Sequence, residues 1–186
     1  MGQINCSDDM LFEKTISRET VFEGKVFTVE VKKITTPEGR EASREIVKHH
    51  GGACILPVDD EGNCYFVKQF RSPFEEVMLA APAGKIEEGE DPLYCASREI
   101  TEETGLTAKN IECVGSMAAT PGYCSEIITL FIGTGLESGD ANPDLNEYVS
   151  TVKMPLKEAL KMAENGEIKD AKTLVLIYKA SRRLGI

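Results

Sequence analysis

A single helical segment set between two strand-rich regions is the feature that most constrains the fold of this chain. Asp91 is a favourable N-cap residue, Pro92 occupies the first helical position, and Gly105 is placed to end the helix in a left-handed conformation. Side chains at helical spacing between these limits are expected to form an inward stripe, and they are Leu93, Ala96, Ile100 and Thr104. Because strands flank this helix on both sides, the chain is predicted to be of the α+β class.

The segment before the helix has the pattern of antiparallel strands. Residues 18–48 are rich in β-forming side chains and carry turn signals at 23–24 and 36–39, which predicts a meander of about three strands. Two apolar runs follow at 53–58 and 64–70. A polar turn at 59–63 joins these two runs, which are expected to be strands of a second β region.

The segment after the helix alternates between strands and helices. Strands are expected at 111–118, 127–134 and 148–154, with a loop at 135–147. A short helix is expected from 155 to about 165, and a final helix from about 170 to 183. The inward residues of the final helix are predicted to be Leu174, Ile177, Tyr178 and Ala180.

Charge and hydropathy exclude several classes of protein. The 186 residues carry 21 Lys and Arg against 31 Asp and Glu, a net charge of −10, so no non-specific attraction to nucleic acid is expected. The longest apolar stretch, 127–136, is far shorter than the roughly 20 residues that span a bilayer, so no membrane segment is expected. The N-terminus lacks the pattern of a signal peptide, and no C-x-x-C pair occurs among the six cysteines. We therefore expect a cytoplasmic protein with reduced, mostly buried thiols.

The helical segment is also the most acidic part of the chain. Seven acids lie between Glu87 and Glu103, and Arg98 is the one basic residue among them. Glu99, Glu102 and Glu103 fall in one sector of the helix, beside the apolar stripe. Like charges at this spacing repel one another, and a divalent cation such as Mg²⁺ would relieve the repulsion. The alternative is a solvated acidic face on a surface helix.

The residues from Gly84 to Leu106 resemble the Nudix box, G-x5-E-x7-R-E-U-x-E-E-x-G-U, where U is a bulky aliphatic residue. Every specified position of the box is matched, and these positions are Gly84, Glu90, Arg98, Glu99, Ile100, Glu102, Glu103, Gly105 and Leu106. Segments outside the box, including 44–53, 67–71, 120–127 and the D-A-K-T at 170–173, are similar to the ADP-ribose pyrophosphatase branch of the family. The resemblance implies an α/β/α sandwich with a mixed β-sheet between helices, preceded by a small antiparallel β-sheet segment.

The resemblance also implies roles for the residues of the box. Glu99, Glu103 and the backbone carbonyl of Ala83 would bind Mg²⁺, or Mn²⁺ in its place, with Glu102 as a further ligand or as the holder of the attacking water. Gly84 would let the backbone pass close to the metal and the substrate. Glu90 and Arg98 would form an internal ion pair that orients the loop and the helix.

Residues outside the box are assigned by the same resemblance. Arg71 would bind a phosphate and Glu126 would lie near the substrate. Glu147 would be the catalytic base or an extra metal ligand. The chain departs from the branch at two positions, because Ala80 and Leu145 stand where glutamates are usual. These departures bear on the identity of the base and on substrate preference.

The function implied is metal-dependent hydrolysis of a nucleoside diphosphate linked to X, with ADP-ribose split into AMP and ribose 5-phosphate. Another nucleotide sugar or dinucleotide, such as GDP-mannose, FAD or NADH, is an alternative substrate. A nucleotide-binding sensor without catalysis is an alternative of another class. The resemblance further implies a homodimer, with residues 1–48 as a dimerisation segment and residues 49–186 as the hydrolase domain.

Overall fold

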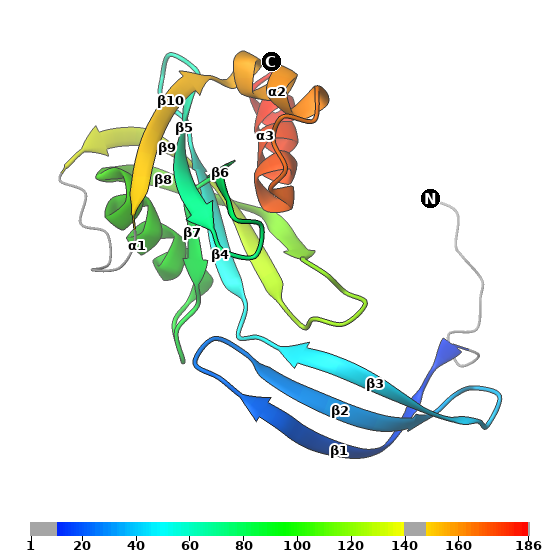
Figure 1. The fold of residues 1–186 in the computed structure, drawn as a ribbon. Coiled ribbons are helices and arrows are strands. Elements are labelled where there is room, and N and C mark those ends of the chain that lie inside the picture. The colour runs from blue at the N-terminus through cyan, green and yellow to red at the C-terminus, as the bar shows by residue number, and fades with distance from the viewer. Residues whose placement is uncertain (1–10, 140–147, 186) are drawn as a thin grey trace. The chain divides into compact units, whose positions relative to one another are not determined.

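The computed structural model describes residues 11–139 and 148–185, which form strands β1 to β10 and helices α1 to α3 (Figure 1). The chain divides into two compact units. One consists of the residues up to His49 together with Thr120–Glu126, and the other of His50–Ala119 together with Ile127–Ile186. The segment 120–126 therefore belongs to the same unit as the N-terminal strands, a grouping that the linear sequence does not suggest.

The first unit is a three-stranded antiparallel meander, as predicted. Its strands are β1 (Lys14–Glu23), β2 (Thr28–Thr35) and β3 (Glu41–Lys48). Hydrogen bonds close the two turns, from Gly24 N to Phe27 O at 3.0 Å and from Gly39 N to Thr36 O at 2.9 Å. The segment 120–126 lies along the end of β3, because Val47 N donates to Tyr123 O at 2.8 Å.

The second unit contains two sheets. A mixed sheet has the strand order β7-β4-β9-β8, in which β4 and β9 are parallel and the other pairs are antiparallel. Its strands are β4 (Gly52–Pro57), β7 (Ala83–Lys85), β8 (Leu106–Ala118) and β9 (Ile127–Ser138). An antiparallel sheet has the order β10-β5-β6, with strands β5 (Asn63–Arg71), β6 (Glu76–Ala80) and β10 (Val149–Pro155).

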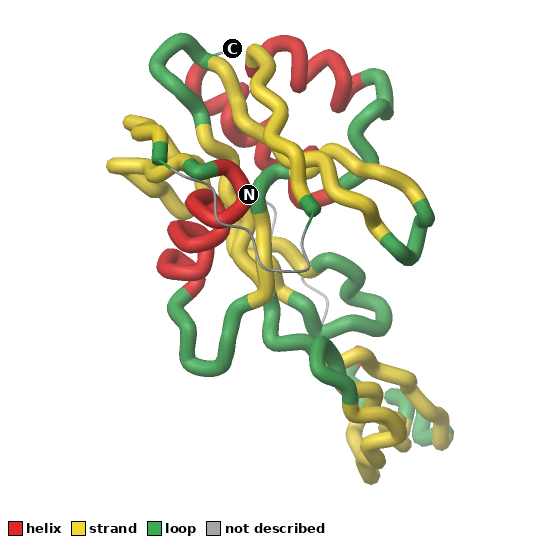
Figure 2. The backbone as a smooth tube through the Cα atoms, turned by 60° about the vertical axis from the view of Figure 1, so that its left-hand side comes forward, coloured by secondary structure: helices red, strands yellow, loops and turns green. Residues whose placement is uncertain are grey.

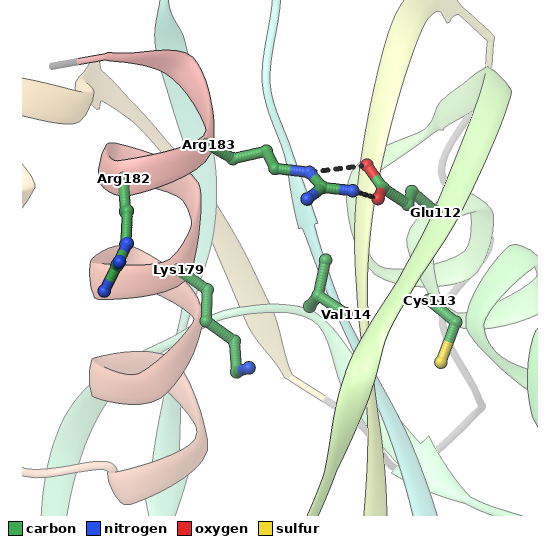
Figure 3. Close-up of a pocket in the computed structure, with 6 residues that line it drawn as sticks. All are labelled: Glu112, Cys113, Val114, Lys179, Arg182 and Arg183. Atoms are coloured by element: carbon green, nitrogen blue, oxygen red, sulfur yellow. Dashed lines mark hydrogen bonds and ion pairs between the residues drawn. The ribbon is translucent and has the colours of Figure 1, made fainter. Parts of the chain in front are cut away.

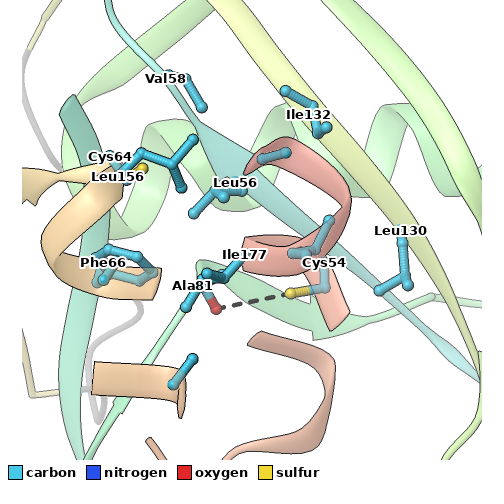
Figure 4. Close-up of a cluster of buried hydrophobic side chains, with 14 of the residues drawn as sticks. Cys54, Leu56, Val58, Cys64, Phe66, Ala81, Leu130, Ile132, Leu156 and Ile177 are labelled. Atoms are coloured by element: carbon cyan, nitrogen blue, oxygen red, sulfur yellow. Dashed lines mark hydrogen bonds between the residues drawn. The ribbon is translucent and has the colours of Figure 1, made fainter. Parts of the chain in front are cut away.

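Helices cover both faces of the mixed sheet (Figure 2). The helices are α1 (Pro92–Thr104), α2 (Leu156–Glu164) and α3 (Ala171–Leu184). Successive side chains of a strand point to opposite faces, so Ala53 and Ile55 of β4 pack in the cluster that contains α1 residues. Cys54 and Leu56 pack in the cluster that contains α2 and α3 residues (Figure 4). This arrangement confirms the predicted sandwich of a mixed sheet between helices.

The structure differs from the expected elements in several places. Neither β6 nor β7 was predicted from the sequence. β7 has only three residues, Ala83–Lys85, and owes its extended form to pairing with β4. β9 continues to Ser138, so residues 135–138 are strand instead of loop, and the remainder of the expected loop lies mostly outside the described residues. Leu93 and Tyr178, both predicted to face inward, are 46% and 47% exposed.

Two further expectations concern membranes and thiols. No helix formed by residues 11–139 and 148–185 combines the length and the apolar character needed to cross a bilayer. Within the same residues the cysteines are free thiols. Cys54, Cys64 and Cys95 are buried while Cys113 is exposed, and Cys6 lies outside the described residues.

Candidate active site

Helix α1 carries most of the candidate site, and its ends form as the sequence predicts. The side chain of Asp91 accepts a hydrogen bond from Leu93 N at 2.8 Å, and Gly105 adopts a φ of 69° while its N–H donates to Thr101 O at 2.9 Å. The buried positions of the helix include Glu99 and Glu103, which are only 7% and 3% exposed. Two carboxylates one turn apart therefore lie on the face of α1 that packs against the protein.

The buried carboxylates of α1 lie against the short strand β7. Ala83 N donates a hydrogen bond to Oε2 of Glu103 at 3.1 Å. A Cβ atom added to Gly84 would lie 1.7 Å from Oε1 of Glu99 and 2.2 Å from its Cδ. Gly84 has no positive φ in this structure, so glycine is needed here for the space that the Glu99 carboxylate occupies. Ala83 thus binds one buried carboxylate, and its neighbour Gly84 leaves room for the other.

Arg98 of α1 is the centre of a charge network that joins the helix to the loop before it. Its Nε donates to Glu90 Oε1 at 3.0 Å, and its Nη1 lies 2.7 Å from Glu99 Oε1 and 2.8 Å from Glu102 Oε2. Hydrogen bonding from Arg98 holds the pKa of Glu90 below its usual value, and hydrogen bonding to Glu90 raises the pKa of Arg98. The network places the Glu90–Arg98 ion pair where the resemblance implies one, and it extends that pair to Glu99 and Glu102.

The carboxylates of the site are compared with the ligands that a divalent cation requires. Among residues 11–139 and 148–185, no three acidic, imidazole or thiol side chains converge in a way that could hold a metal ion. Glu102 is turned toward Arg98, and its side chain is 30% exposed. Mg²⁺ commonly takes one or two protein carboxylates together with waters and substrate phosphates. The buried Glu99, beside Gly84, and the buried Glu103, beside Ala83, fit that requirement.

The remaining predicted residues are placed as follows. Arg71 ends β5 in a half-buried position opposite Glu76 of β6. Glu126 belongs to the other compact unit, where its carboxylate lies 3.5 Å from Nδ1 of His49. Glu147 and Leu145 lie outside the described residues. Ala80, the other departure from the branch, is 1% exposed at the end of β6.

A group that sequence reasoning did not assign lies at the start of α3. Thr173 is fully buried, and its hydroxyl oxygen accepts a hydrogen bond from Ala81 N at 2.8 Å. Asp170 caps the helix and accepts hydrogen bonds from both the N–H and the hydroxyl of Thr173. The signal available in the sequence was the similarity of D-A-K-T at 170–173 to the ADP-ribose pyrophosphatase branch. That similarity does not indicate which residues the segment contacts.

A cavity of about 510 Å³ lies between β8 and α3 (Figure 3). Arg183 and Glu112 form an ion pair there, with Nε of Arg183 3.2 Å from the carboxylate. The cavity is lined by Glu112, Cys113, Val114, Lys179, Arg182 and Arg183. None of the predicted site residues lines this cavity, so it is not part of the candidate active site.

The fold and the site define a sandwich protein with carboxylates gathered on one helix beside the mixed sheet. The NUDIX domain family matches residues 48–176. The ADP-ribose pyrophosphatase of Bacillus subtilis (strain 168) is 42% identical over 169 residues, covering 90% of this chain and 91% of that protein. The "Methanol dehydrogenase activator" of Bacillus methanolicus is 37% identical, covering 89% and 90%.

The fold comparison agrees with the sequence comparison. The solved structure described as "Crystal structure of ADP compounds hydrolase" superposes with a TM-score of 0.82 at 20% identity, covering 94% of this chain and 96% of that one. The chain belongs to the Nudix family. The resemblance drawn from the sequence is thereby confirmed, and so is the expectation that the chain is an enzyme of the pyrophosphohydrolase class.

Proposed function

We propose that this enzyme hydrolyses the diphosphate bond of ADP-ribose and releases AMP and ribose 5-phosphate, with Mg²⁺ or Mn²⁺ as cofactor. The observation that carries the proposal is the pair of buried carboxylates, Glu99 and Glu103, held against Ala83 and Gly84 of β7. The substrate is inferred from the 42% identity to the ADP-ribose pyrophosphatase of Bacillus subtilis.

The metal would be held by the carboxylates of Glu99 and Glu103 and by the backbone carbonyl of Ala83. When bound, a divalent cation neutralises the negative charge of the diphosphate and stabilises the charge that develops during phosphoryl transfer. The burial of both carboxylates strengthens their interaction with a cation, because the local dielectric is lower than that of water.

The other side chains position the reactants. Glu102 would bind a metal or hold the attacking water, and Arg71 would bind a phosphate through its planar, permanently charged fork. Glu147 would accept the proton of that water as it attacks phosphorus, and Glu126 would contact the substrate. The bond between the attacked phosphorus and the bridging oxygen breaks, giving one molecule each of AMP and ribose 5-phosphate. Glu90 would keep Arg98 in place beside Glu99 and Glu102.

We extend the proposal to the assembly and location of the enzyme. Residues 1–48 would form a dimerisation segment and residues 49–186 the hydrolase domain of a cytoplasmic homodimer. Several apolar side chains of the meander are exposed, among them Ile16, Val21 and Phe22, and a partner subunit would cover such side chains.

The test is product release from ADP-ribose in the presence and absence of Mg²⁺, measured beside GDP-mannose and FAD. Turnover that depends on Mg²⁺ and is fastest with ADP-ribose is expected. Faster turnover of another substrate would retain the chemistry and overturn the substrate, for which Ala80 and Leu145 would be the first residues to examine. In the Glu103→Gln variant, unchanged turnover would remove the proposed metal role of Glu103.

A non-catalytic nucleotide-binding sensor is the candidate of a different class. The observation in its favour is the relative named as an activator of methanol dehydrogenase. Against it stands the complete Nudix box, in which every specified position is retained. Binding of ADP-ribose without turnover of any substrate in the presence of Mg²⁺ would support the sensor.

A further inference from the structure

The start of helix α3 forms a buried hydrogen-bonded group that the proposed function does not use. Asp170 Oδ1 accepts hydrogen bonds from Thr173 N at 3.0 Å and from Thr173 Oγ1 at 2.5 Å. Lys172 Nζ lies 2.6 Å from Asp170 Oδ2, and the side chains of this ion pair are only 15% and 18% exposed. The group is therefore fixed by charge as well as by burial.

This group reaches a turn that lies 92 residues earlier in the chain. A hydroxyl has one proton, and Thr173 donates its proton to Asp170, so the oxygen lone pairs remain to accept a bond. Ala81 N donates to that oxygen at 2.8 Å, and Ala81 is itself 1% exposed. The charged acceptor beyond the hydroxyl thus determines which way the hydroxyl faces.

The turn from Ala81 to Ala83 connects β6 to β7, the strand that lies against the buried carboxylates of α1. Pro82 restricts its own φ, and its carbonyl accepts a hydrogen bond from Ile55 N at 2.9 Å. The thiol of Cys54 lies 3.8 Å from Ala81 O on the same side (Figure 4). At the far end of the turn, Ala83 N donates to Glu103 Oε2. The turn is thus held at Ala81 by α3 and is joined to a buried carboxylate of α1 two residues later.

We propose that Thr173, oriented by Asp170 and Lys172, is a positioning residue that fixes the turn 81–83 and thereby the metal-binding geometry of Ala83 and Glu103. The inference rests on the proposed function, because it takes Ala83 and Glu103 as metal ligands. Partners that orient the ligands of a metal typically change metal affinity by about 10- to 100-fold when they are removed.

The experiment measures Mn²⁺ affinity of the full chain by calorimetry, without substrate, in matched variants. Thr173→Val keeps the shape of the side chain and removes the hydroxyl, and it is expected to weaken Mn²⁺ binding by about 10- to 100-fold. Thr173→Ser restores the hydroxyl and is expected to restore binding to near the wild-type value. Ile177→Val, at a fully buried position one turn later in α3, is the control for a general loss of packing and is expected to leave Mn²⁺ binding unchanged.

A second variant keeps the test decisive if Thr173→Val does not fold. Asp170→Asn preserves a good N-cap residue while removing the charge that orients the hydroxyl, and it is expected to weaken Mn²⁺ binding several-fold. Wild-type Mn²⁺ affinity in Thr173→Val overturns the inference. Where that variant does not fold, wild-type affinity in Asp170→Asn does so. An equal loss of Mn²⁺ affinity in Ile177→Val also overturns the inference. A wild-type chain that binds no Mn²⁺ overturns the proposed function and this inference together. Wild-type Mn²⁺ affinity in the variants overturns this inference alone, so the two failures are distinguishable.

Discussion

The carboxylate of Glu99 occupies the space beside Gly84 where the side chain of any other residue would begin. The distance between Oε1 of Glu99 and a Cβ built on Gly84 is 1.7 Å, less than half of an ordinary van der Waals contact. Glycine at this position and glutamate at 99 are therefore one structural unit, contributed by β7 and α1. The same carboxylate is bound by Arg98 at 2.7 Å, so its position is determined from two sides.

Replacing Gly84 with alanine tests this relationship. The added methyl group must displace Glu99, and we expect turnover to fall by about 100-fold, the usual effect of moving a catalytic group by about 1 Å. The measurement is kcat with saturating Mg²⁺ and substrate. Gly166→Ala is the control, because Gly166 has a φ of +75° with no atom near a built Cβ, so this variant loses stability without touching the site. Equal kcat in Gly84→Ala and wild type would contradict the arrangement.

Replacing Glu90 with glutamine is expected to lower the free energy of unfolding at pH 7 by about 2 kcal/mol, because hydrogen bonds between charged groups are lost in a buried setting. The pKa of Glu90 is lowered in the folded protein, so this stabilisation is complete above the unfolded pKa of about 4.3. It disappears as the pH falls through the lower folded value. Urea unfolding of both proteins from pH 7 to pH 3 measures the difference. Glu88→Gln, at an exposed neighbouring position, is the control and should change little.

The two faces of α1 can be separated by a pair of truncations. Ile100 is fully buried and packs in the cluster with Ala53 and Ile55, so Ile100→Ala is expected to destabilise the protein by about 2–5 kcal/mol. Leu93 belongs to the same sequence stripe but is 46% exposed, so Leu93→Ala is expected to change stability by only about 0.5 kcal/mol. Chemical denaturation measures both. Similar losses in the two variants would show that the stripe, as read from sequence, is uniformly buried.

The cysteines are expected to differ sharply in reactivity. Burial raises the pKa of the Cys64 and Cys95 thiols to about 12, whereas Cys113 is exposed on β8. Because the thiolate is the nucleophile, iodoacetamide at pH 8 should label Cys113 in the native protein and should label Cys64 and Cys95 only after denaturation. Peptide mass spectrometry measures the order of labelling. Cys113→Ser should remove the fast-labelled peptide, and native labelling of Cys95 at the rate of Cys113 would count against the structure.

The helix and its caps were predictable because local chemistry determines them. Asp91, Pro92 and Gly105 mark the ends of α1 at the residues where the structure has them. The meander and the buried strands were predictable for a similar reason, since their turns are polar and their apolar side chains are regularly spaced. The short strand β7 was not predictable, because a three-residue strand is created by its pairing with Gly52–Cys54.

In the candidate site, too, the sequence predicted some features and only the structure shows the others. The motif identified Glu99 and Glu103, but only the structure shows that both are buried against β7. Thr173 and Ala81 are 92 residues apart, and no local pattern predicts a hydrogen bond between them. The exposure of Tyr178 has a related cause, because helical periodicity predicts a stripe but not how far the neighbouring strands extend to cover it.

The network around Arg98 has a consequence for the order of folding and metal binding. Three carboxylates of the box, one before α1 and two within it, share the guanidinium of Arg98. The guanidinium offsets part of their mutual repulsion within the polypeptide, and we infer that the helix can form without an external cation. We expect the apoprotein to fold and to unfold cooperatively in a chelator, so that metal loading follows folding instead of driving it.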